Sequence, residues 1–265
     1  MAHPVLQHVM LATGLERSIV DYKKFVILGR SRTGSNFLRG LLASRGGVIV
    51  LGEIFKNPER VEWGTKGFPV RPGAEKLYSK DPVAFLQKDV FRSVPRGTEA
   101  VGFKLFYYHA QSQGRRQIWE HLRHRDDVHI IHIMRRNILK THLSRERASR
   151  NDEWVSLSRG KREEAPLVLS AEDCLEQFQQ TRRWEKEFGD FFEGVPLMPV
   201  YYEDLVEDSD RIMADVQDFL GLEIRPVVPL THKQARRPIS EAIANFEELR
   251  QAFRGTEWQA FFDTE

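Results

Sequence analysis

The sequence predicts an α/β fold in which a central, mostly parallel sheet of about five strands is flanked by helices, giving three layers. Two observations predict this fold. Short apolar runs of strand length alternate along the chain with longer segments of helical periodicity. The runs are apolar almost throughout, as in strands that are covered on both faces. The chain has 265 residues, and we expect one domain over residues 1–265.

Five segments have the character of strands in this sheet. Each is short and apolar, and each is bounded by polar or glycine-containing turns. The five expected strands are 25–29, 48–51, 100–106, 128–134 and 197–202.

Segments with helical periodicity lie between and after these strands. The expected helices are 37–45, 138–150, a long helix from its cap at Ser170 to Phe191, 212–220, and a last helix capped by Ser240 and extending to Phe253. Two stretches, 55–72 and 151–169, lack strong periodicity. Because ligands bind beyond the carboxyl ends of parallel strands, we expect these two stretches to be substrate-lid loops.

The composition argues against several classes of protein. Forty basic and 38 acidic side chains give a net charge of +2, which is too balanced for a protein that coats nucleic acid. Cys174 is the single cysteine, so no intrachain disulfide can form, and the composition fits a reducing compartment. No apolar run is long enough for a signal peptide or a transmembrane segment. We therefore expect a cytoplasmic protein with no nucleic-acid partner.

A polar loop follows the first strand and has the composition of an anion site. It reads Arg30-Ser-Arg-Thr-Gly-Ser-Asn36 and leads into a helix. The N–H groups at the start of a helix favour an anion, and Gly34 allows the backbone to approach it closely. Arg32, Thr33 and Ser35 add side-chain donors. This order of strand, anion loop and helix makes the expected fold P-loop-like, although an ordinary polar turn shares the pattern.

The loop differs from that of a nucleoside triphosphatase. The pattern G-x-x-x-x-G-K-[ST] is absent, because no lysine follows Gly34. The fourth strand ends in Met134-Arg135-Arg136, where a triphosphate enzyme needs a carboxylate to hold magnesium. His129 and His132 are three positions apart in a strand and so face opposite sides of the sheet. We therefore expect no metal site.

A second, basic motif stands at the end of the fourth strand. The segment 135–150 carries six basic side chains and one acidic one, Glu146, in a nearly neutral chain. Arg136 and Ser144 are eight positions apart, just over two helical turns, so both could contact one phosphate. The alternatives are a solvated basic helix face and, more remotely, an RNA-binding surface.

Together these motifs resemble those of sulfotransferases that use 3′-phosphoadenosine 5′-phosphosulfate (PAPS), and most closely the bacterial and carbohydrate-type members. Arg32-Thr-Gly-Ser-Asn-Phe37 is similar to the 5′-phosphosulfate loop of that family. Arg136-Asn137 followed by Ser144 is similar to its 3′-phosphate motif. Tyr202-Glu-Asp-Leu205 also resembles the family at the matching place.

The resemblance implies that PAPS is the co-substrate and 3′,5′-adenosine bisphosphate (PAP) the product. The residues implied to hold the nucleotide are Arg32, Thr33, Gly34, Ser35, Asn36, Phe37, Arg136 and Ser144. The R-K-G-x-x-G-x-x-K segment that closes the nucleotide site in the cytosolic branch is missing. Lys233, Arg236 and Arg237 stand at a comparable place, either as nucleotide contacts or as ordinary loop charges.

Four side chains are candidates for the chemistry of sulfuryl transfer. Glu53 resembles the proposed general base of carbohydrate sulfotransferases, and it follows the second strand, which we expect beside the first. Lys104 resembles the family lysine near the transferred group, and Arg32 would join it in stabilising the leaving phosphate. His109 is the second candidate base. The structural alternatives are an ion pair for Glu53 and a surface position for Lys104.

We therefore expect a sulfotransferase that moves a sulfuryl group from PAPS to an acceptor hydroxyl by in-line attack. The resemblance favours a carbohydrate or glycolipid acceptor, with Trp63, Trp154 and Trp184 as sugar contacts or as packing. A divergent small-molecule kinase and a catalytically silent nucleotide-binding relative are the two alternatives. The expected partner is a small-molecule or glycan acceptor. The sequence does not specify the oligomeric state, and a homodimer is compatible with it.

Overall fold

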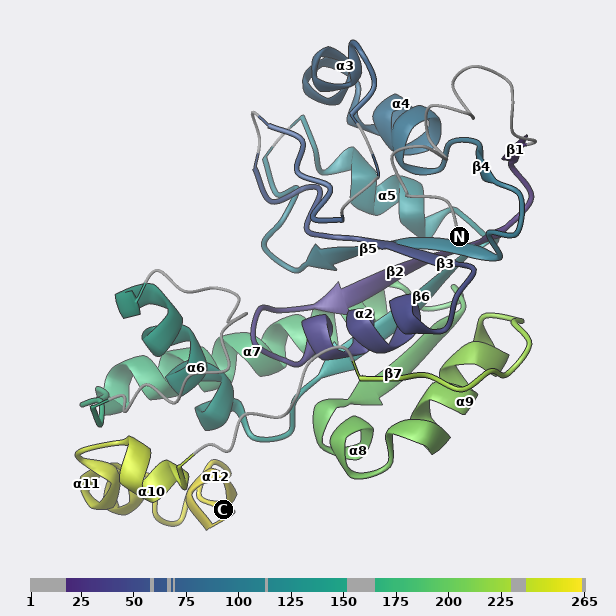
Figure 1. The fold of residues 1–265 in the computed structure, drawn as a ribbon. Helices are drawn as coiled ribbons and strands as arrows, with labels where there is room; N and C mark the ends of the chain where they lie inside the picture. The colour runs from purple at the N-terminus through teal and green to yellow at the C-terminus, as the bar shows by residue number, and fades with distance from the viewer. Residues whose placement is uncertain are drawn as a thin grey trace.

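A five-stranded parallel sheet forms the centre of the molecule, as the computed structural model shows (Figure 1). The structure describes residues 18–57, 60–65, 68, 70–112, 114–151, 165–229 and 237–263. Its strands, in sheet order, are β3 (Val48–Leu51), β5 (Ala100–Phe106), β2 (Lys23–Gly29), β6 (Val128–Met134) and β7 (Leu197–Tyr201). The predicted fold class is confirmed, and the expected strands match these to within two residues at each end.

The order of the strands corrects one expectation. The expected place of β3 is beside β2, but β5 lies between them. Strand β5 is buried along all seven residues and pairs with β2 over its whole length, from Lys23↔Ala100 to Gly29↔Phe106. Strand β3 has only four residues and forms the edge. The longer apolar strand β5 takes the interior position because an interior strand is hydrogen-bonded on both sides and covered on both faces.

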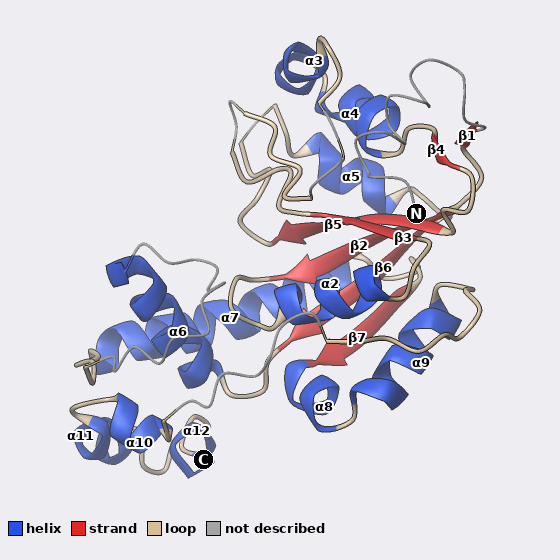
Figure 2. Ribbon diagram, in the orientation of Figure 1, coloured by secondary structure: helices blue, strands red, loops and turns tan. Residues whose placement is uncertain are grey.

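Helices cover both faces of the sheet (Figure 2). Helices α2 (Ser35–Ser44), α8 (Tyr202–Glu207) and α9 (Ser209–Phe219) pack on one face. The other face carries α3 (Ala74–Lys80), α4 (Pro82–Phe85), the π-helical turn η1 (Leu86–Val90), α5 (Gln117–Arg123) and part of α7 (Ala171–Phe191). A small antiparallel pair, β1 (Ser18–Ile19) and β4 (Val94–Pro95), lies apart from the main sheet. The two apolar clusters on either face thus sandwich the strands, as the sequence predicts.

A third apolar cluster lies beyond the carboxyl edge of the sheet. There α6 (Ile138–Asn151) and the first half of α7 pack against α10 (Ile239–Ala242), α11 (Phe246–Ala252) and α12 (Ala260–Asp263). The predicted cap of α7 is confirmed, since Ser170 accepts a hydrogen bond from the backbone N–H of Asp173. As a member of this cluster, α6 lies next to the anion loop.

The single helix expected from Ser240 to Phe253 is wrong. Ser240 lies inside α10, and the chain leaves the helix at Ile243, which forms a parallel bridge with Leu167. Asn245 then bonds both the N–H and the carbonyl oxygen of Leu169, at 3.1 and 2.9 Å. These long-range hydrogen bonds replace helical ones, so two short helices form in place of one.

The two expected lid stretches are described only in part. In the stretch 55–72, Trp63 is buried and stacks on Phe85, with ring centroids 5.6 Å apart. In the stretch 151–169, Leu167 and Leu169 are buried. Trp154 lies outside the described residues. The described parts of both stretches therefore contribute apolar side chains to the core, and a lid role for the rest stays a prediction.

Two further expectations concern helices and histidines. Among the helices that the structure describes, none is long and apolar enough to cross a membrane. His132 bonds the Tyr107 hydroxyl at 2.5 Å, whereas His129 lies against Phe219 of α9. The two histidines therefore face opposite sides of the sheet, as the spacing predicts.

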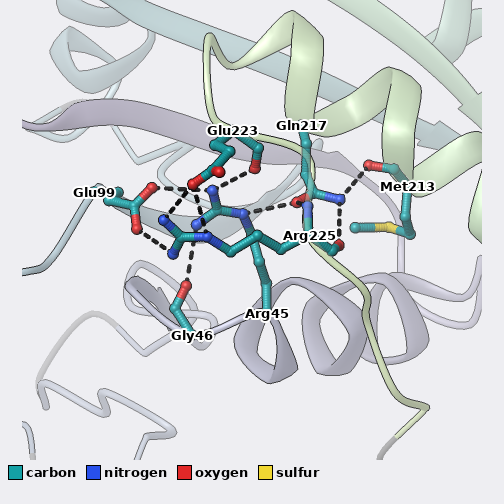
Figure 3. Close-up of polar contacts among 7 residues, drawn as sticks. All are labelled: Arg45, Gly46, Glu99, Met213, Gln217, Glu223 and Arg225. Atoms are coloured by element: carbon teal, nitrogen blue, oxygen red, sulfur yellow. Dashed lines mark hydrogen bonds and ion pairs between the residues drawn. The ribbon is translucent and has the colours of Figure 1, made fainter.

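A buried arginine, Arg45, is at the centre of a network of polar contacts with Glu99, Gln217 and Glu223 (Figure 3). The side chain of Arg45, just after α2, is 0% exposed. It donates to Gln217 Oε1 at 2.7 Å, to Glu99 Oε2 at 3.0 Å and to the carbonyl oxygen of Glu223 at 2.6 Å. Arg225 pairs with Glu99 from the solvent side at 2.6 Å. This network joins the end of α2 to the start of β5 and to the chain after α9.

Replacing Arg45 with methionine should lower the free energy of unfolding by about 3 kcal/mol, because it removes the charged hydrogen bonds that this buried guanidinium makes to Gln217, Glu99 and the Glu223 carbonyl oxygen. Arg225→Met is the matched control, since the Arg225 side chain is 40% exposed and its ion pair with Glu99 should contribute much less than the buried contacts of Arg45. Urea unfolding of both variants measures the difference. Equal losses would show that burial does not set the strength of this network.

Candidate active site

The anion loop occupies the turn between β2 and α2, at the carboxyl edge of the sheet. A hydrogen bond inside the loop stabilises its backbone, since the Thr33 hydroxyl donates to the carbonyl oxygen of Arg30 at 2.8 Å. Arg32 and Gly34 both have positive φ, 70° and 92°. Gly34 is also the residue before α2, and no side chain caps that helix. The turn therefore leaves the positive end of a ten-residue helix without a side-chain acceptor, which suits an anion.

Glycine is required at position 34 for two reasons. Its left-handed conformation is costly for other residues. In addition, a Cβ atom at this position would overlap the ring of Tyr202. Arg135 lies over the same ring, 4.8 Å from its centroid. Tyr202 therefore joins the loop to the basic motif at the end of β6.

The loop meets α6 directly. Arg32 Nε donates to Ser144 Oγ at 2.8 Å, so the structure brings together two residues implied to hold the nucleotide. Arg135 Nη1 also reaches the carbonyl oxygen of Arg32, at 3.4 Å. Of the other loop residues, Thr33 and Ser35 are buried, and Phe37 packs partly into the apolar cluster beneath α2.

Arg136 is paired with α8. It makes two hydrogen bonds to the Asp204 carboxylate, at 2.6 and 2.7 Å, and lies over the ring of Tyr201, 4.2 Å from its centroid. These bonds raise the pKa of Arg136 and lower that of Asp204. Arg136 therefore lies at the same carboxyl edge of the sheet as the anion loop, but its side chain contacts residues of β7 and α8.

Lys104 connects the anion loop with the candidate base. It is 3% exposed, and its Nζ donates to Asn36 Oδ1 at 2.7 Å and to Glu53 Oε1 at 3.0 Å. Burial lowers the pKa of Lys104, while Glu53 acts in the opposite direction. The Lys104 backbone N–H also donates to the Gly52 carbonyl oxygen at 3.1 Å, which sets Glu53 beside it. A surface position for Lys104 is therefore wrong.

His109 lies next to Glu53 and is protonated on the nitrogen that faces it. Its Nδ1 accepts a hydrogen bond from the Phe106 backbone N–H at 3.2 Å, so the neutral ring carries its proton on Nε2. That Nε2 is buried and stands 3.9 Å from Glu53 Oε2. Burial lowers the pKa of His109 to about 4, and the ring is neutral at pH 7. A neutral ring in this tautomer has a donor, and no free lone pair, toward Glu53.

Arg30 is a residue of the site that the sequence analysis did not single out. It is 1% exposed and donates to the hydroxyl of Thr181 and to Gln177 Oε1 of α7, the latter at 3.0 Å. Arg145 of α6 shares Gln177 at 2.6 Å. Burial and the charge of Arg145 lower the pKa of Arg30 to about 10. Its position directly after a buried strand was the available signal, but its partners lie about 150 residues away along the chain.

An aromatic surface adjoins the loop on the side of α7. Tyr108 is 40% exposed, and its hydroxyl accepts a hydrogen bond from the Ser31 N–H at 3.2 Å. Its ring lies 5.1 Å from that of His109 and 5.8 Å from that of Trp184. Tyr108, which the sequence analysis missed, and Trp184, which it named, thus stand beside the Glu53 cluster.

Of the three C-terminal basic residues predicted to contact the nucleotide, only Arg237 lies among the described residues. Lys233 and Arg236 lie outside the described residues. Arg237 is described and exposed, at the start of the segment that leads into α10. Their roles as nucleotide contacts stay predictions.

Comparisons with known proteins agree on one family. Residues 24–226 match a family model described as "Sulfotransferase family". Nodulation protein H of Rhizobium meliloti is 25% identical over 255 residues, covering 94% of this chain and 98% of that protein. Nodulation protein H of Rhizobium tropici is 23% identical over 248 residues, covering 93% and 95%.

Solved structures show the same fold. A sulfotransferase from Alicyclobacillus acidocaldarius superimposes with a TM-score of 0.51 at 18% identity, covering 92% of this chain and 97% of that one. The sulfotransferase domain of the Synechococcus PCC 7002 olefin synthase gives a TM-score of 0.50 at 18% identity, covering 92% and 86%.

Gly34→Ala should cost more stability than its conformation alone accounts for, because the new methyl group displaces Tyr202. Gly73→Ala is the matched control, since Gly73 has φ 83° and no atom lies within 4 Å of the place that its Cβ would take. The control should cost about 1–2 kcal/mol. Gly34→Ala should exceed it in urea unfolding and should also weaken PAP binding. Equal costs with intact binding would contradict the packing of Tyr202 on the loop.

Proposed function

This chain belongs to the sulfotransferase family, and from that premise we propose that it transfers a sulfuryl group from PAPS to a hydroxyl of a carbohydrate or glycolipid. The observation that carries the proposal is the position of Lys104. Its ammonium group bridges Asn36 of the anion loop and Glu53, so that an anion-binding element, a cation and a carboxylate lie together.

The proposed nucleotide site uses the loop and the basic motif. The 5′-phosphosulfate would lie at the start of α2, where Arg32 and the uncapped helix end supply positive charge. The 3′-phosphate would lie near Arg136 and Ser144. The Arg32–Ser144 hydrogen bond supports this arrangement because it directly joins the two motifs that are proposed to bind the phosphates.

The proposed chemistry is an in-line displacement at sulfur. Glu53 accepts the proton of the acceptor hydroxyl, the acceptor oxygen forms a bond to sulfur, and the bond from sulfur to the phosphate oxygen breaks to release PAP. Lys104 and Arg32 stabilise the charge that develops on the leaving oxygen. The tautomer of His109 supports Glu53 as the base, because His109 faces it with a donor. At 3.9 Å the His109 N–H makes no hydrogen bond to Glu53, so Lys104 is the group that would hold the carboxylate in place.

Two findings support an acceptor of the carbohydrate class. The loop has the R-[ST]-G-[ST] form of the carbohydrate branch, and proteins named nodulation protein H match nearly the whole chain. The exposed ring of Tyr108, close to Trp184, also provides an aromatic surface of the kind on which the apolar face of a sugar can stack. The arginines at the end of β6 stand where a kinase would need a magnesium-holding carboxylate, which disfavours the kinase alternative.

Activity is tested by incubating the protein with radiolabelled PAPS and a panel of neutral oligosaccharides and glycolipids. The expected result is label in at least one acceptor together with stoichiometric PAP. A protein that binds PAP tightly but transfers label to no acceptor would be the catalytically silent relative.

Glu53→Gln should lower kcat by about 10²–10⁴-fold, because a positioned general base contributes about that much. The dissociation constant of PAP should change by less than about twofold. Glu62→Gln is the matched control, since Glu62 is an exposed carboxylate in the same region, 3.9 Å from Arg60. Steady-state kinetics and PAP titration measure both. Undiminished turnover in Glu53→Gln would remove Glu53 as the base.

A further inference from the structure

The arginine proposed to bind the 3′-phosphate is already held by a carboxylate. Asp204 accepts two hydrogen bonds from Arg136, at 2.6 and 2.7 Å, from Nη1 and Nη2. Such an ion pair could affect phosphate binding in two opposite ways. The carboxylate either competes with the phosphate for the arginine or orients the arginine for it.

The geometry leaves part of Arg136 available. A guanidinium group has five N–H donors, and Asp204 uses two of them. The Nε–H and the second hydrogens of Nη1 and Nη2 remain. The side chain is 49% exposed, and one face of it lies over Tyr201, 4.2 Å from the ring centroid. Arg136 is thus fixed on one edge and one face while other donors stay accessible to a ligand.

The neighbouring carboxylate fixes the backbone of the same turn. Glu203 accepts hydrogen bonds from the backbone N–H groups of Arg136 and Asn137, at 3.0 and 3.4 Å. The Asn137 side chain in turn accepts from the N–H of Lys140, in the first turn of α6. Two consecutive acidic residues at the beginning of α8 therefore hold both the main chain and the side chain of the motif at the end of β6.

The sheet explains why these residues meet. Strands β6 and β7 are parallel neighbours, and Met134 pairs with Tyr201. The residues that follow each strand, Arg135–Asn137 and Tyr202–Asp204, therefore emerge side by side at the same edge. The fold therefore sets the motif Tyr202-Glu-Asp-Leu205 against the phosphate motif. The residues that form hydrogen bonds between the two motifs are 66 to 68 positions apart in the chain.

We infer that Asp204 is a positioning residue, which holds the guanidinium of Arg136 ready for the 3′-phosphate of the nucleotide. The inference rests on the proposed function. A long arginine side chain loses considerable rotamer freedom when it binds a phosphate, and a bond already made to Asp204 removes part of that cost before the ligand arrives. Competition predicts the opposite effect, since removal of a nearby negative charge would then strengthen phosphate binding.

The test compares PAP with adenosine 5′-monophosphate, which lacks only the 3′-phosphate. In the wild type, PAP should bind more tightly by at least tenfold. Asp204→Ala should weaken PAP binding by about tenfold and change binding of the monophosphate by less than twofold. In steady state it should raise the KM for PAPS with kcat nearly unchanged. Asp204→Glu should restore part of the lost preference.

Two controls separate positioning from general effects of charge and stability. Asp215→Ala removes the same charge from an exposed ion pair on α9, 3.5 Å from Arg211, and should leave the preference intact. In an Arg136→Ala background, Asp204→Ala should have no further effect on the preference, because the residue acts through Arg136.

The outcomes are distinct. An unchanged or increased preference for PAP in Asp204→Ala overturns the positioning role, and an increase would assign Asp204 as a competitor of the phosphate. A persistent effect of Asp204→Ala without Arg136 also overturns it. A wild type that does not prefer PAP over the monophosphate overturns the proposed function itself, and the inference with it.

Discussion

A buried ammonium group is the interaction on which this site depends. Lys104 lies within β5, a buried interior strand, where a charge is costly unless hydrogen bonds and an opposite charge compensate it. Asn36 supplies the hydrogen bond from α2, and Glu53 supplies the charge from the chain after β3. Because one cation must satisfy both partners, the anion loop and the candidate base are held at a fixed separation.

The strand order makes this possible. Strand β5 lies between β3 and β2, so its side chains at the carboxyl edge stand between the segments that follow those two strands. Had β3 paired with β2, Glu53 would adjoin the loop without an intervening lysine. At the other end of α2, the buried Arg45 network holds the helix against β5 and the end of α9. The helix that presents the anion loop is therefore anchored at both ends.

Four arginines in or next to the loop are oriented by three helices, since Tyr202 and Asp204 both belong to α8. Arg30 is held by α7, Arg32 by α6, Arg135 lies over Tyr202, and Arg136 is paired with α8. Like charges this close repel one another, and the lowered pKa of Arg30 reflects both its burial and a neighbouring arginine. A nearly neutral chain thus concentrates positive charge at one edge of its sheet, where an anionic ligand would offset the repulsion.

The sequence was sufficient to predict the strands, the anion loop and the basic motif, because each depends on local composition and periodicity. It also named Glu53, Lys104, Arg32 and Ser144, and the structure pairs Lys104 with Glu53 and Arg32 with Ser144. It could not predict the pairing of Arg136 with Asp204 or of Arg30 with Thr181, because these contacts depend on strand order and helix placement. The division of 239–252 into two helices was missed for the same reason, since hydrogen bonds from Leu167 and Leu169 cause it.

Calorimetric titration with PAP, with and without a chelator of divalent cations, tests the central claim most directly. Binding by arginines, a lysine and a helix end requires no metal, so we predict one-to-one binding with the same affinity in both conditions. Adenosine triphosphate should bind more weakly, and magnesium should not strengthen its binding. Binding of the triphosphate alone, and only with magnesium, would contradict the account and would indicate a kinase.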